Sequence, residues 1–312
     1  MRQMIQRYGL GLLLSMAILG LASCGKSEKS LVPVIDNPFE GVTVGTDSTL
    51  EITTWNLEHF AKQGDATVTA VVQAIEAMDV DIIALQEIQN FTYFRQMRQA
   101  LEGWDGDRAT SAGYDINLAF LYRIDGDLEV DSVYEILVEF RREFPRRPLV
   151  LEARYNETQI VVINNHFKCC GNGTIDEDDE WDEETRRRDA SLLLDEFIRT
   201  NYEGKHVVVV GDFNDSLTDI PSRNVFQNFI DAPDDYRFVD MGIAEGSGTG
   251  WSFPGWPSHL DHILVGGSLF EALSGNDAAV MVVPLHTYLR NGLSDYDPLI
   301  SDHLPVVLKV GF

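Results

Sequence analysis

Cysteine is scarce in this sequence, with three in 312 residues. Two of them are neighbours, Cys169 and Cys170, and the third, Cys24, lies near the N-terminus. There is no Cys-x-x-Cys pair and no second cysteine cluster, so the sequence excludes the usual structural zinc sites.

Basic residues are also scarce: 24 Lys and Arg stand against 50 Asp and Glu. Such an acidic surface repels nucleic acid and anionic lipid at long range, and no basic stripe with interleaved aromatics appears. A phosphate substrate remains compatible with this charge if a cation sits in the site. Part of the excess is local, because eight of residues 176–184 are acidic. We expect a solvated loop there, and a loop that binds a structural Ca²⁺ is the alternative.

Long apolar runs are missing, apart from one near the N-terminus. Residues 9–20 are almost wholly apolar, follow Arg2 and Arg7, and lead into Leu-Ala-Ser-Cys, which ends at Cys24. This pattern is typical of a secretory signal and is too short for a comfortable membrane span. The ending resembles a bacterial lipoprotein box, which implies lipidation of Cys24. An ordinary signal peptide with a chance cysteine is the alternative.

The chain is therefore expected to have three parts. Residues 1–23 are predicted to be a lipoprotein signal peptide, residues 24–48 a flexible tether, and residues 49–312 one folded domain. The lipoprotein resemblance implies an exported protein with a lipid anchor in a membrane, at the periplasmic face or the cell surface. No protein partner is implied.

Residue patterning predicts strands interleaved with three helices. Helical spacing of apolar residues predicts helices at 68–78, 91–101 and 185–199. Apolar and β-branched runs predict strands at 52–55, 81–85, 118–122, 133–140, 149–154, 159–164, 206–210, 260–265 and 304–310. This order indicates a layered α/β domain with two sheets and helices outside them.

Polar residues end or flank six of these strands. The segments read Trp-Asn-Leu-Glu, Leu-Gln-Glu, Asn-Asn-His, Gly-Asp-Phe-Asn, Leu-Asp-His and Ser-Asp-His. Two carboxylates about 4 Å apart repel by roughly 4 kcal/mol at an effective dielectric of 20, so converging carboxylates need protons or a cation. Oxygen ligands without cysteine favour Mg²⁺, Mn²⁺ or Ca²⁺ over zinc.

In this order the motifs resemble the endonuclease/exonuclease/phosphatase superfamily, the deoxyribonuclease-I-like proteins. The resemblance covers about residues 52–310 and makes residues 49–312 the catalytic domain. It implies an α/β fold: a four-layer sandwich of two packed, largely antiparallel sheets flanked by helices. The site is expected at one mouth of the paired sheets.

The resemblance also implies roles for individual residues. Mg²⁺ or Mn²⁺ would be held by Asn56, Glu58, Glu87 and Asp302. The predicted catalytic residues are His166 at the scissile phosphate, Asp212 on the attacking water, Asn214 on the phosphate, and His303 with Asp261 fixing its tautomer.

Three further residues are expected to contact substrate: Asn117, Arg147 and Lys168. Tyr114 is a weaker candidate, and His262 is expected to be a packing or hydrogen-bonding residue.

The adjacent cysteines are expected to form a strained vicinal disulfide beside His166. Adjacent Cα atoms lie about 3.8 Å apart, below the usual disulfide range. Two free thiols or an intermolecular bond are the alternatives.

The implied activity is divalent-metal-dependent hydrolysis of phosphodiesters by a nuclease-like enzyme, with DNA or RNA as the partner. Trp251, Phe253 and Trp256 could then stack bases, but packing within their loop is the favoured explanation for them. A phospholipid or inositol-phosphate esterase is the first alternative, and a non-catalytic binding lipoprotein is the second.

Overall fold

The computed structural model describes residues 37–112 and 116–312. The predicted signal peptide, Cys24, the first part of the predicted tether and Tyr114 lie outside these residues. Among the described helices, none has both the length and the apolar character needed to cross a bilayer.

The second half of the predicted tether is part of the folded unit, which begins at Asn37. Phe39 is fully buried, and Val42 and Val44 are nearly so, in the same core as helix α1 (Asp65–Met78). The side chain of Asn37 donates to the carbonyl of Gln73 at 2.9 Å. The prediction of a tether over residues 37–48 is therefore wrong, because three apolar side chains among the polar residues suffice to dock this segment.

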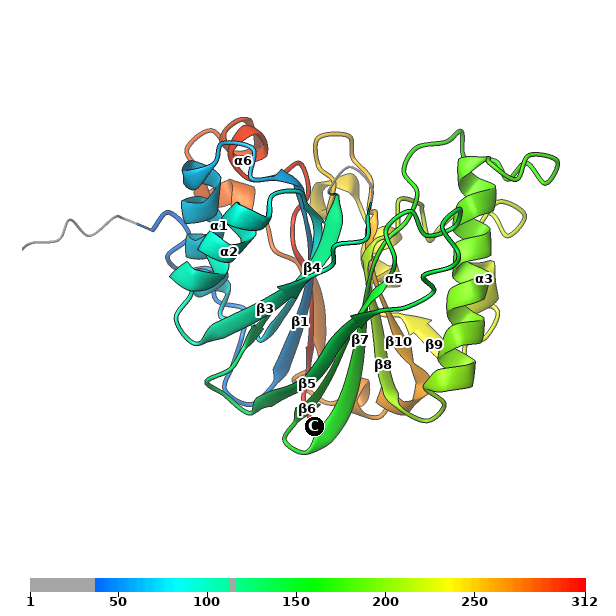
Figure 1. Cartoon of the computed structure of the whole chain (residues 1–312), viewed down its shortest axis with the longest axis horizontal. Helices are drawn as coiled ribbons and strands as arrows, with labels where there is room; N and C mark the ends of the chain where they lie inside the picture. The colour runs from blue at the N-terminus through cyan, green and yellow to red at the C-terminus, as the bar shows by residue number, and fades with distance from the viewer. Residues whose placement is uncertain (1–36, 113–115) are drawn as a thin grey trace, which may run out of the picture. The chain divides into compact units, whose positions relative to one another are not determined.

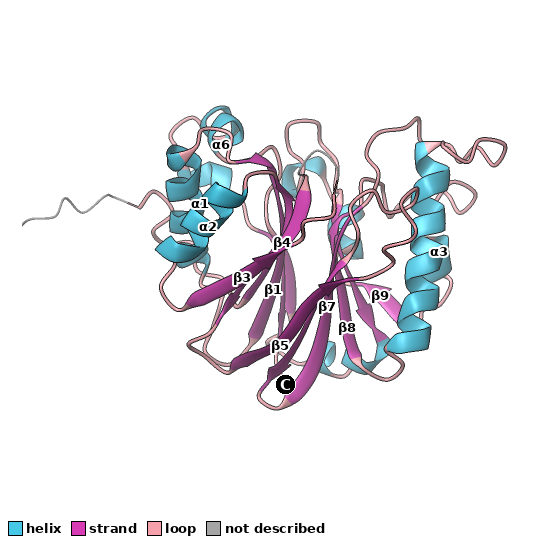
Figure 2. Cartoon of the chain, in the orientation of Figure 1, coloured by secondary structure: helices cyan, strands magenta, loops and turns pink. Residues whose placement is uncertain are grey.

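Two six-stranded sheets form the centre of the fold (Figures 1 and 2). In spatial order, the first sheet contains β11 (Ala279–Val282), β12 (Val306–Val310), β1 (Leu50–Phe60), β2 (Ile82–Ile88), β4 (Asn117–Arg123) and β3 (Trp104–Arg108). The second contains β5 (Leu128–Glu135), β6 (Leu149–Tyr155), β7 (Thr158–His166), β8 (His206–Asp212), β10 (Asp261–Gly266) and β9 (Tyr236–Phe238). Within the described residues, β1–β2 and β7–β8 are parallel and the other neighbours are antiparallel.

Helices cover the outer faces of the two sheets. Helices α1 and α2 (Phe91–Ala100) flank the first sheet with α6 (Leu293–Leu299), and α3 (Glu183–Asn201) flanks the second (Figure 1). Two short helices, α4 (Gln227–Ile230) and α5 (Met241–Ala244), lie in the connections after β8. Separate apolar cores fill the three interfaces between layers. The predicted four-layer sandwich is confirmed.

Local sequence explains the three long helices. Helix α1 buries Val68, Val71, Ile75 and Met78 at helical spacing, and each such side chain contributes about 1.5–3 kcal/mol. Asn90 caps α2 by accepting from Thr92 N at 2.9 Å, and an aspartate caps α3 in the same way.

Some strands differ from the prediction. The strand expected at 133–140 is β5, which ends at Glu135 because the chain turns away at Leu137, whose φ is 52°. The prediction did not include β3, β9 and β11. These three strands are short sheet edges, and β3 reads Trp-Asp-Gly-Asp-Arg, which carries no apolar alternation.

Candidate active site

Strand ends from both sheets meet at one edge of the sandwich, the upper edge in Figure 1. The parallel strands β1, β2, β7 and β8 all end there, and β4, β6, β10 and β12 begin there. On the second sheet, Asp212 pairs in register with His166 on one side and Asp261 on the other. These three residues therefore form a single row across β7, β8 and β10.

Bulges turn the carboxylates of the first sheet into the site. The register of β1 with β2 shifts between Asn56 and Phe60, and that of β2 with β4 shifts after Leu85. Glu58 and Glu87 lie within these irregularities at φ of 36° and 60°. A left-handed conformation costs a glutamate about 1–3 kcal/mol, a cost usually met at functional sites.

Gly211 allows the two parallel strands of the second sheet to approach closely. Its φ is 149°, and a Cβ added there would lie 2.0 Å from the carbonyl oxygen of Asn165. Any side chain would therefore push β8 away from β7 and separate Asp212 from His166.

A polar pair joins the two sheets just below the site. Gln86 donates to Asn164 Oδ1 at 2.8 Å, and Asn164 Nδ2 donates in turn to the carbonyls of Leu85 and Ala119, each at 3.0 Å. Both amide side chains are fully buried. Because these groups are satisfied only when the sheets face each other in this register, the pair fixes one half of the site against the other.

His303 forms a close pair with Asp261. Nδ1 of His303 lies 2.7 Å from Oδ2 of Asp261, and its Nε2 lies 3.9 Å from Oδ2 of Asp212. Burial opposes a charge on this imidazole, but the carboxylates of Asp261, Asp212 and Asp302 outweigh it and raise the pKa of His303 to about 10. His303 is therefore an imidazolium near neutral pH.

The imidazole of His166 differs from that of His303, because its pKa is lowered. Its Nε2 lies 3.6 Å from Oδ2 of Asp212 and 3.9 Å from Oε1 of Glu87. Burial, assisted by the positive charges of Arg146 and His303, holds the pKa of His166 well below its usual value. Its Nδ1 is buried without a hydrogen-bond partner in the described residues. One neutral and one charged imidazole thus flank Asp212.

Asp212 lies at the centre of this arrangement. Its Oδ2 accepts from Asn56 Nδ2 at 3.0 Å, and its Oδ1 accepts from the backbone N–H of Asn214 at 3.0 Å. Burial raises the pKa of Asp212 to about 6, although the imidazolium of His303 opposes the shift. A carboxyl group with this pKa is suited to exchange a proton near neutral pH.

The predicted metal ligands meet on the first-sheet side. Asn56 Nδ2 also donates to Glu87 Oε1 at 3.3 Å, and Glu58 accepts from the backbone N–H of Asp302 at 3.0 Å. Burial raises the pKa of Asp302 to about 7; its Oδ1 is buried without a hydrogen-bond partner among the described residues and lies 3.8 Å from Nε2 of His303. Neighbouring carboxylates with a buried oxygen that accepts no hydrogen bond fit a hard divalent cation.

The structure gives Glu58 a second partner. Lys62 contacts the Glu58 carboxylate and also lies 3.0 Å from Oδ1 of Asp297. Glu58 is therefore neutralised within the chain and bonded to the Asp302 backbone. Among the four predicted ligands, Glu87 and Asp302 remain the carboxylates without a Lys or Arg partner in the described residues.

Arg146, rather than Arg147, lies at the site. Arg147 donates to the carbonyls of Ser111 and Val138 and so holds two loops together. Arg146 donates to the carbonyl of Phe167 at 2.6 Å, and the same oxygen accepts from Asn214 Nδ2 at 3.3 Å. Its Nε is buried without a described partner, and burial lowers its pKa despite the nearby charges of Asp212 and Glu87. Sequence reasoning missed this residue.

The other two predicted substrate contacts, Asn117 and Lys168, differ in whether their side chains are available to a substrate. Asn117 is buried at the start of β4, and its Nδ2 has no partner among the described residues, so a donor remains available there. Lys168 donates to the carbonyl of Cys169 at 2.8 Å and lies 3.7 Å from Glu183. The structure thus directs Lys168 toward α3 rather than toward His166.

The cysteines are free thiols in this structure, with sulfur atoms 3.1 Å apart, so the expected vicinal disulfide is not present. Buried Arg187 fixes their loop by donating to the carbonyls of Lys168 and Cys170 at 2.7 and 2.8 Å. In the acidic run, Asp182 caps α3 and Glu184 pairs with Arg187. Glu184 Oε2 is buried without a hydrogen-bond partner among the described residues, and the Ca²⁺ loop stays a prediction.

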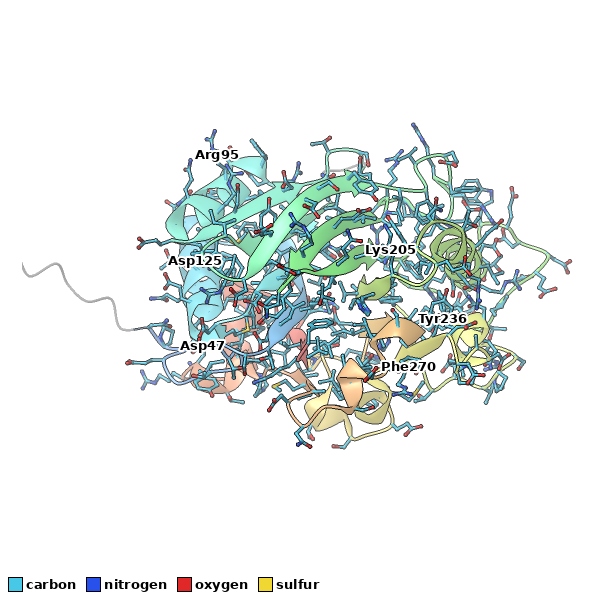
Figure 3. All side chains as sticks on the ribbon, turned by 90° about the horizontal axis from the view of Figure 1, so that it is seen from below. Asp47, Arg95, Asp125, Lys205, Tyr236 and Phe270 are labelled. Carbon is cyan, nitrogen blue, oxygen red and sulfur yellow. The ribbon has the colours of Figure 1, made fainter. Side chains whose placement is uncertain are left out.

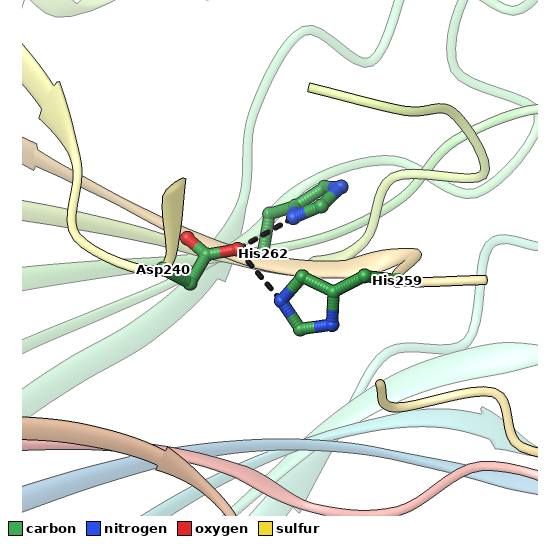
Figure 4. A group of neighbouring side chains, drawn as sticks. All are labelled: Asp240, His259 and His262. Carbon is green, nitrogen blue, oxygen red and sulfur yellow. Dashed lines mark hydrogen bonds and ion pairs between the residues drawn. The ribbon is translucent and has the colours of Figure 1, made fainter. Parts of the chain in front are cut away.

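Asp240, His259 and His262 form a second buried cluster (Figure 4). Oδ2 of Asp240 lies 2.6 Å from Nδ1 of His262 and 3.0 Å from Nε2 of His259. The remaining ring nitrogens contact the carbonyl of Asp215 and the backbone N–H of Ser252. Since every ring nitrogen has a partner, the cluster is a hydrogen-bond network, as expected for His262, and not an open metal site.

A buried imidazolium beside a carboxylate row suits a reaction in which negative charge develops on phosphate oxygen. On a four-layer α/β sandwich, these features define a hydrolase of the phosphoric-ester class. The chain belongs to the endonuclease/exonuclease/phosphatase family, whose model matches residues 53–303. Membership of this family makes the protein a hydrolase of the phosphodiesterase or phosphatase type.

Several solved structures share the fold. TDP2 of D. rerio, complexed with a single-strand DNA product, is 14% identical with a TM-score of 0.65, over 85% of this chain and 100% of that one. The human Nocturnin catalytic domain with bound sulfate is 17% identical with a TM-score of 0.57, over 85% and 94%. A mannosyl-6-phosphatase of Bacteroides thetaiotaomicron is 17% identical with a TM-score of 0.54, over 84% and 100%. Comparison with curated protein sequences gives no significant match.

Proposed function

We propose that this protein is a divalent-metal-dependent phosphodiesterase of the nuclease-like type. The observation that carries the proposal is the geometry around Asp212: its Oδ2 lies 3.6 Å from Nε2 of His166 and 3.9 Å from Nε2 of His303, and Nδ1 of His303 lies 2.7 Å from Asp261. A phosphodiester needs both an acceptor for the proton of the attacking water and a cationic donor near phosphate oxygen.

Each group has a distinct task in this scheme. Asp212, held by Asn56 and the Asn214 backbone, orients the attacking water and accepts its proton. His303, held by Asp261 at 2.7 Å, donates a hydrogen bond or its proton to phosphate or leaving-group oxygen. Asn214 and Arg146, which share the Phe167 carbonyl, bind the remaining phosphate oxygens.

The residues present fit a divalent cation of the hard, oxygen-preferring kind. Glu87 and Asp302 would hold Mg²⁺ or Mn²⁺. Asn56, whose Nδ2 donates to Glu87 Oε1, would position that carboxylate, and Glu58 would orient Asp302 through its backbone N–H. Such an ion, when bound, supplies positive charge that stabilises phosphate oxygens.

Purified protein supplied with Mg²⁺ or Mn²⁺ should cleave plasmid DNA or bis-p-nitrophenyl phosphate. Asp212→Asn should lower kcat/KM by at least about 100-fold, in line with the loss of general acid–base catalysis. The exposed Asp277→Asn is the matched control and should retain activity. Full metal-dependent activity in Asp212→Asn would refute the proposal.

A phosphate ester of a small molecule or lipid is the second candidate. It is supported by the net charge of −26, which opposes polyanions, and by the fold likeness to a protein named as a mannosyl-6-phosphatase. Comparing kcat/KM across DNA, RNA, sphingomyelin, inositol phosphates and a sugar phosphate discriminates the two. A non-catalytic binding role is disfavoured, because Glu87, Asp212 and His303 are all present.

We also propose that Cys24 carries a lipid that anchors the protein to a membrane, on the strength of the Leu-Ala-Ser-Cys ending. Cys24→Ser should move the protein from the membrane fraction to the soluble fraction and abolish labelling by radioactive palmitate. A membrane-bound, unlabelled wild-type protein would contradict the anchor.

A further inference from the structure

The loop before β10 contains a small hairpin with an exposed tryptophan at its apex. Phe253 and Ser258 exchange both backbone hydrogen bonds, at 3.0 and 3.2 Å, and enclose Pro-Gly-Trp-Pro. Trp256 is 79% exposed, and its carbonyl accepts from Ser258 Oγ at 2.6 Å. Two prolines restrict the turn, so little backbone freedom remains to be lost when the indole binds something.

The base of this hairpin rests on the catalytic histidine. The rings of Phe253 and His303 have centroids 4.8 Å apart, and the backbone N–H of Leu304 donates to the carbonyl of Ser252 at 2.7 Å. Trp256 is therefore three residues from a side chain in contact with His303. In Figure 1 the loop rises at the upper edge between the two sheets, where the site lies.

The buried Asp240 cluster, drawn in Figure 4, also contacts the base of the hairpin. Its His259 accepts from the backbone N–H of Ser252 at 3.4 Å, and Ser252 Oγ accepts from the backbone of Leu260 and Asp261 at 3.3 Å each. The side chains of Ser252, His259 and Asp261 are all buried. The hairpin is thus tied to Asp261 and His303 together, which gives the apex a defined position relative to the scissile phosphate.

The three aromatic side chains of this loop have different environments. Trp251 Nε1 donates to the carbonyl of Ile243 at 2.9 Å, and Phe253 packs on His303, so both serve the structure. Trp256 makes no such side-chain contact among the described residues and stays in solvent. A single exposed apolar side chain needs no functional explanation by itself. The place of this indole on a rigid turn whose base contacts His303 is what points to a binding residue.

We propose that Trp256 forms a stacking subsite for a nucleobase attached next to the scissile phosphate. The inference rests on the proposed function, because it identifies the substrate class of that same site. A base offers a flat face for the indole, and such stacking tolerates any base and needs no basic surface. It therefore reconciles nucleotide binding with a strongly acidic protein.

A lipid surface is the competing ligand for an exposed tryptophan. Interfacial membrane binding scales with buried apolar area and is strengthened by basic residues. The hairpin apex presents one indole between two prolines, a glycine and a serine, without a lysine or arginine. These features favour a single stacked ring over a membrane contact.

The test compares two small substrates and three variants. Thymidine 5′-(p-nitrophenyl phosphate) carries a base, whereas methyl p-nitrophenyl phosphate has the same leaving group without one. Trp256→Ala should raise KM about tenfold for the thymidine substrate only, with kcat little changed. Trp256→Phe should restore most of the affinity, and Trp181→Ala, which changes another exposed tryptophan (60% exposed), should change nothing.

Binding of fluorescent oligo(dT) by the full chain gives a readout that does not depend on turnover, and Trp256→Ala should weaken it about tenfold. Equal effects on both substrates, or an unchanged oligo(dT) affinity, would overturn the subsite. So would a Trp256→Ala variant that loses binding to phosphatidylcholine vesicles while keeping oligo(dT) affinity. A wild type that hydrolyses neither substrate but binds oligo(dT) through Trp256 would instead refute the proposed catalysis alone.

Discussion

Nδ1 of His303 lies 2.7 Å from Oδ2 of Asp261, and the two residues come from different sheets of the sandwich. Asp261 begins β10 of the second sheet, whereas His303 precedes β12 of the first. The carboxylate fixes which ring nitrogen faces Asp212 and stabilises the charged imidazole. This contact therefore couples the packing of the sheets to the protonation state of the site.

Replacing Asp261 with asparagine should lower kcat/KM by about 100-fold or more, because His303 loses both its orientation and its charge stabilisation. Steady-state kinetics on a phosphodiester, together with circular dichroism to verify folding, measures the effect. Asp277→Asn serves as the control. Wild-type kinetics in a folded Asp261→Asn variant would exclude the pair from catalysis.

Mg²⁺ or Mn²⁺ should raise the melting temperature, since a ligand bound to the folded state alone stabilises it by about 2.7 kcal/mol at a concentration 100 times Kd. Thermal scans with and without the ion detect this in the absence of substrate. Glu87→Gln should remove the shift, whereas the exposed Glu76→Gln on α1 should keep it. An equal shift in both variants would place the ion elsewhere.

Replacing Arg146 and replacing Arg147 should have different effects, the first on activity and the second on stability. Arg146→Met should lower kcat/KM by about 10-fold to 100-fold, because a charge-assisted contact to phosphate contributes roughly 1.5–3 kcal/mol. Arg147→Met should instead lower the melting temperature, because its guanidinium ties Ser111 to the Val138 loop. The test is to measure kcat/KM and the melting temperature of both variants. A loss of activity in Arg147→Met and a loss of stability in Arg146→Met would identify Arg147 as the substrate contact.

A buried carboxyl pair at the far end of the sheets should make stability depend on pH. Figure 3 shows this end from below, with Asp47 and Asp125 at its rim. Burial raises the pKa of Glu51 from 4.5 to about 8, and the carboxyl of Asp81 adds to the shift. The folded state thus holds a proton that the unfolded state has lost, so the free energy of unfolding falls as pH rises from about 4.5 to about 8.

Glu51→Gln removes this titration and should stabilise the protein by about 2 kcal/mol at pH 8, with little change at pH 4.5. Chemical denaturation at several pH values measures the difference. Glu76→Gln is the exposed control and should follow the wild type. If Glu51→Gln retained the same pH dependence, another group would be responsible.

The boundary of the folded unit is also testable. Phe39→Ala should cost about 3–5 kcal/mol, as expected for a fully buried phenylalanine. A chain starting at Asn37 should fold like the longer protein, whereas one starting at residue 49 should be markedly less stable. Equal denaturation midpoints for the two truncations would show that residues 37–48 do not contribute to the folded unit.

The predicted site residues that the structure brings together are those whose signal in the sequence is local. Asn56 follows the apolar part of β1, Asp212 is the last residue of β8, and His303 precedes β12, and such strand ends are visible without a structure. The choice between Arg146 and Arg147 was not accessible, because neighbours in an extended segment point to opposite sides and the register was unknown. The Lys62 contact with Glu58 depends on the bulge in β1, which no residue pattern indicates.

The Gln86–Asn164 contact has a consequence for how activity is lost. Each sheet carries half of the reacting groups. A fragment that contains one sheet therefore lacks the other half and should have no activity. A slight sliding of one sheet over the other would separate His303 from Asp261 while leaving every strand intact. Inactivation on heating should therefore precede the loss of secondary structure, so that activity reports on the interface between the sheets and not on the sheets themselves.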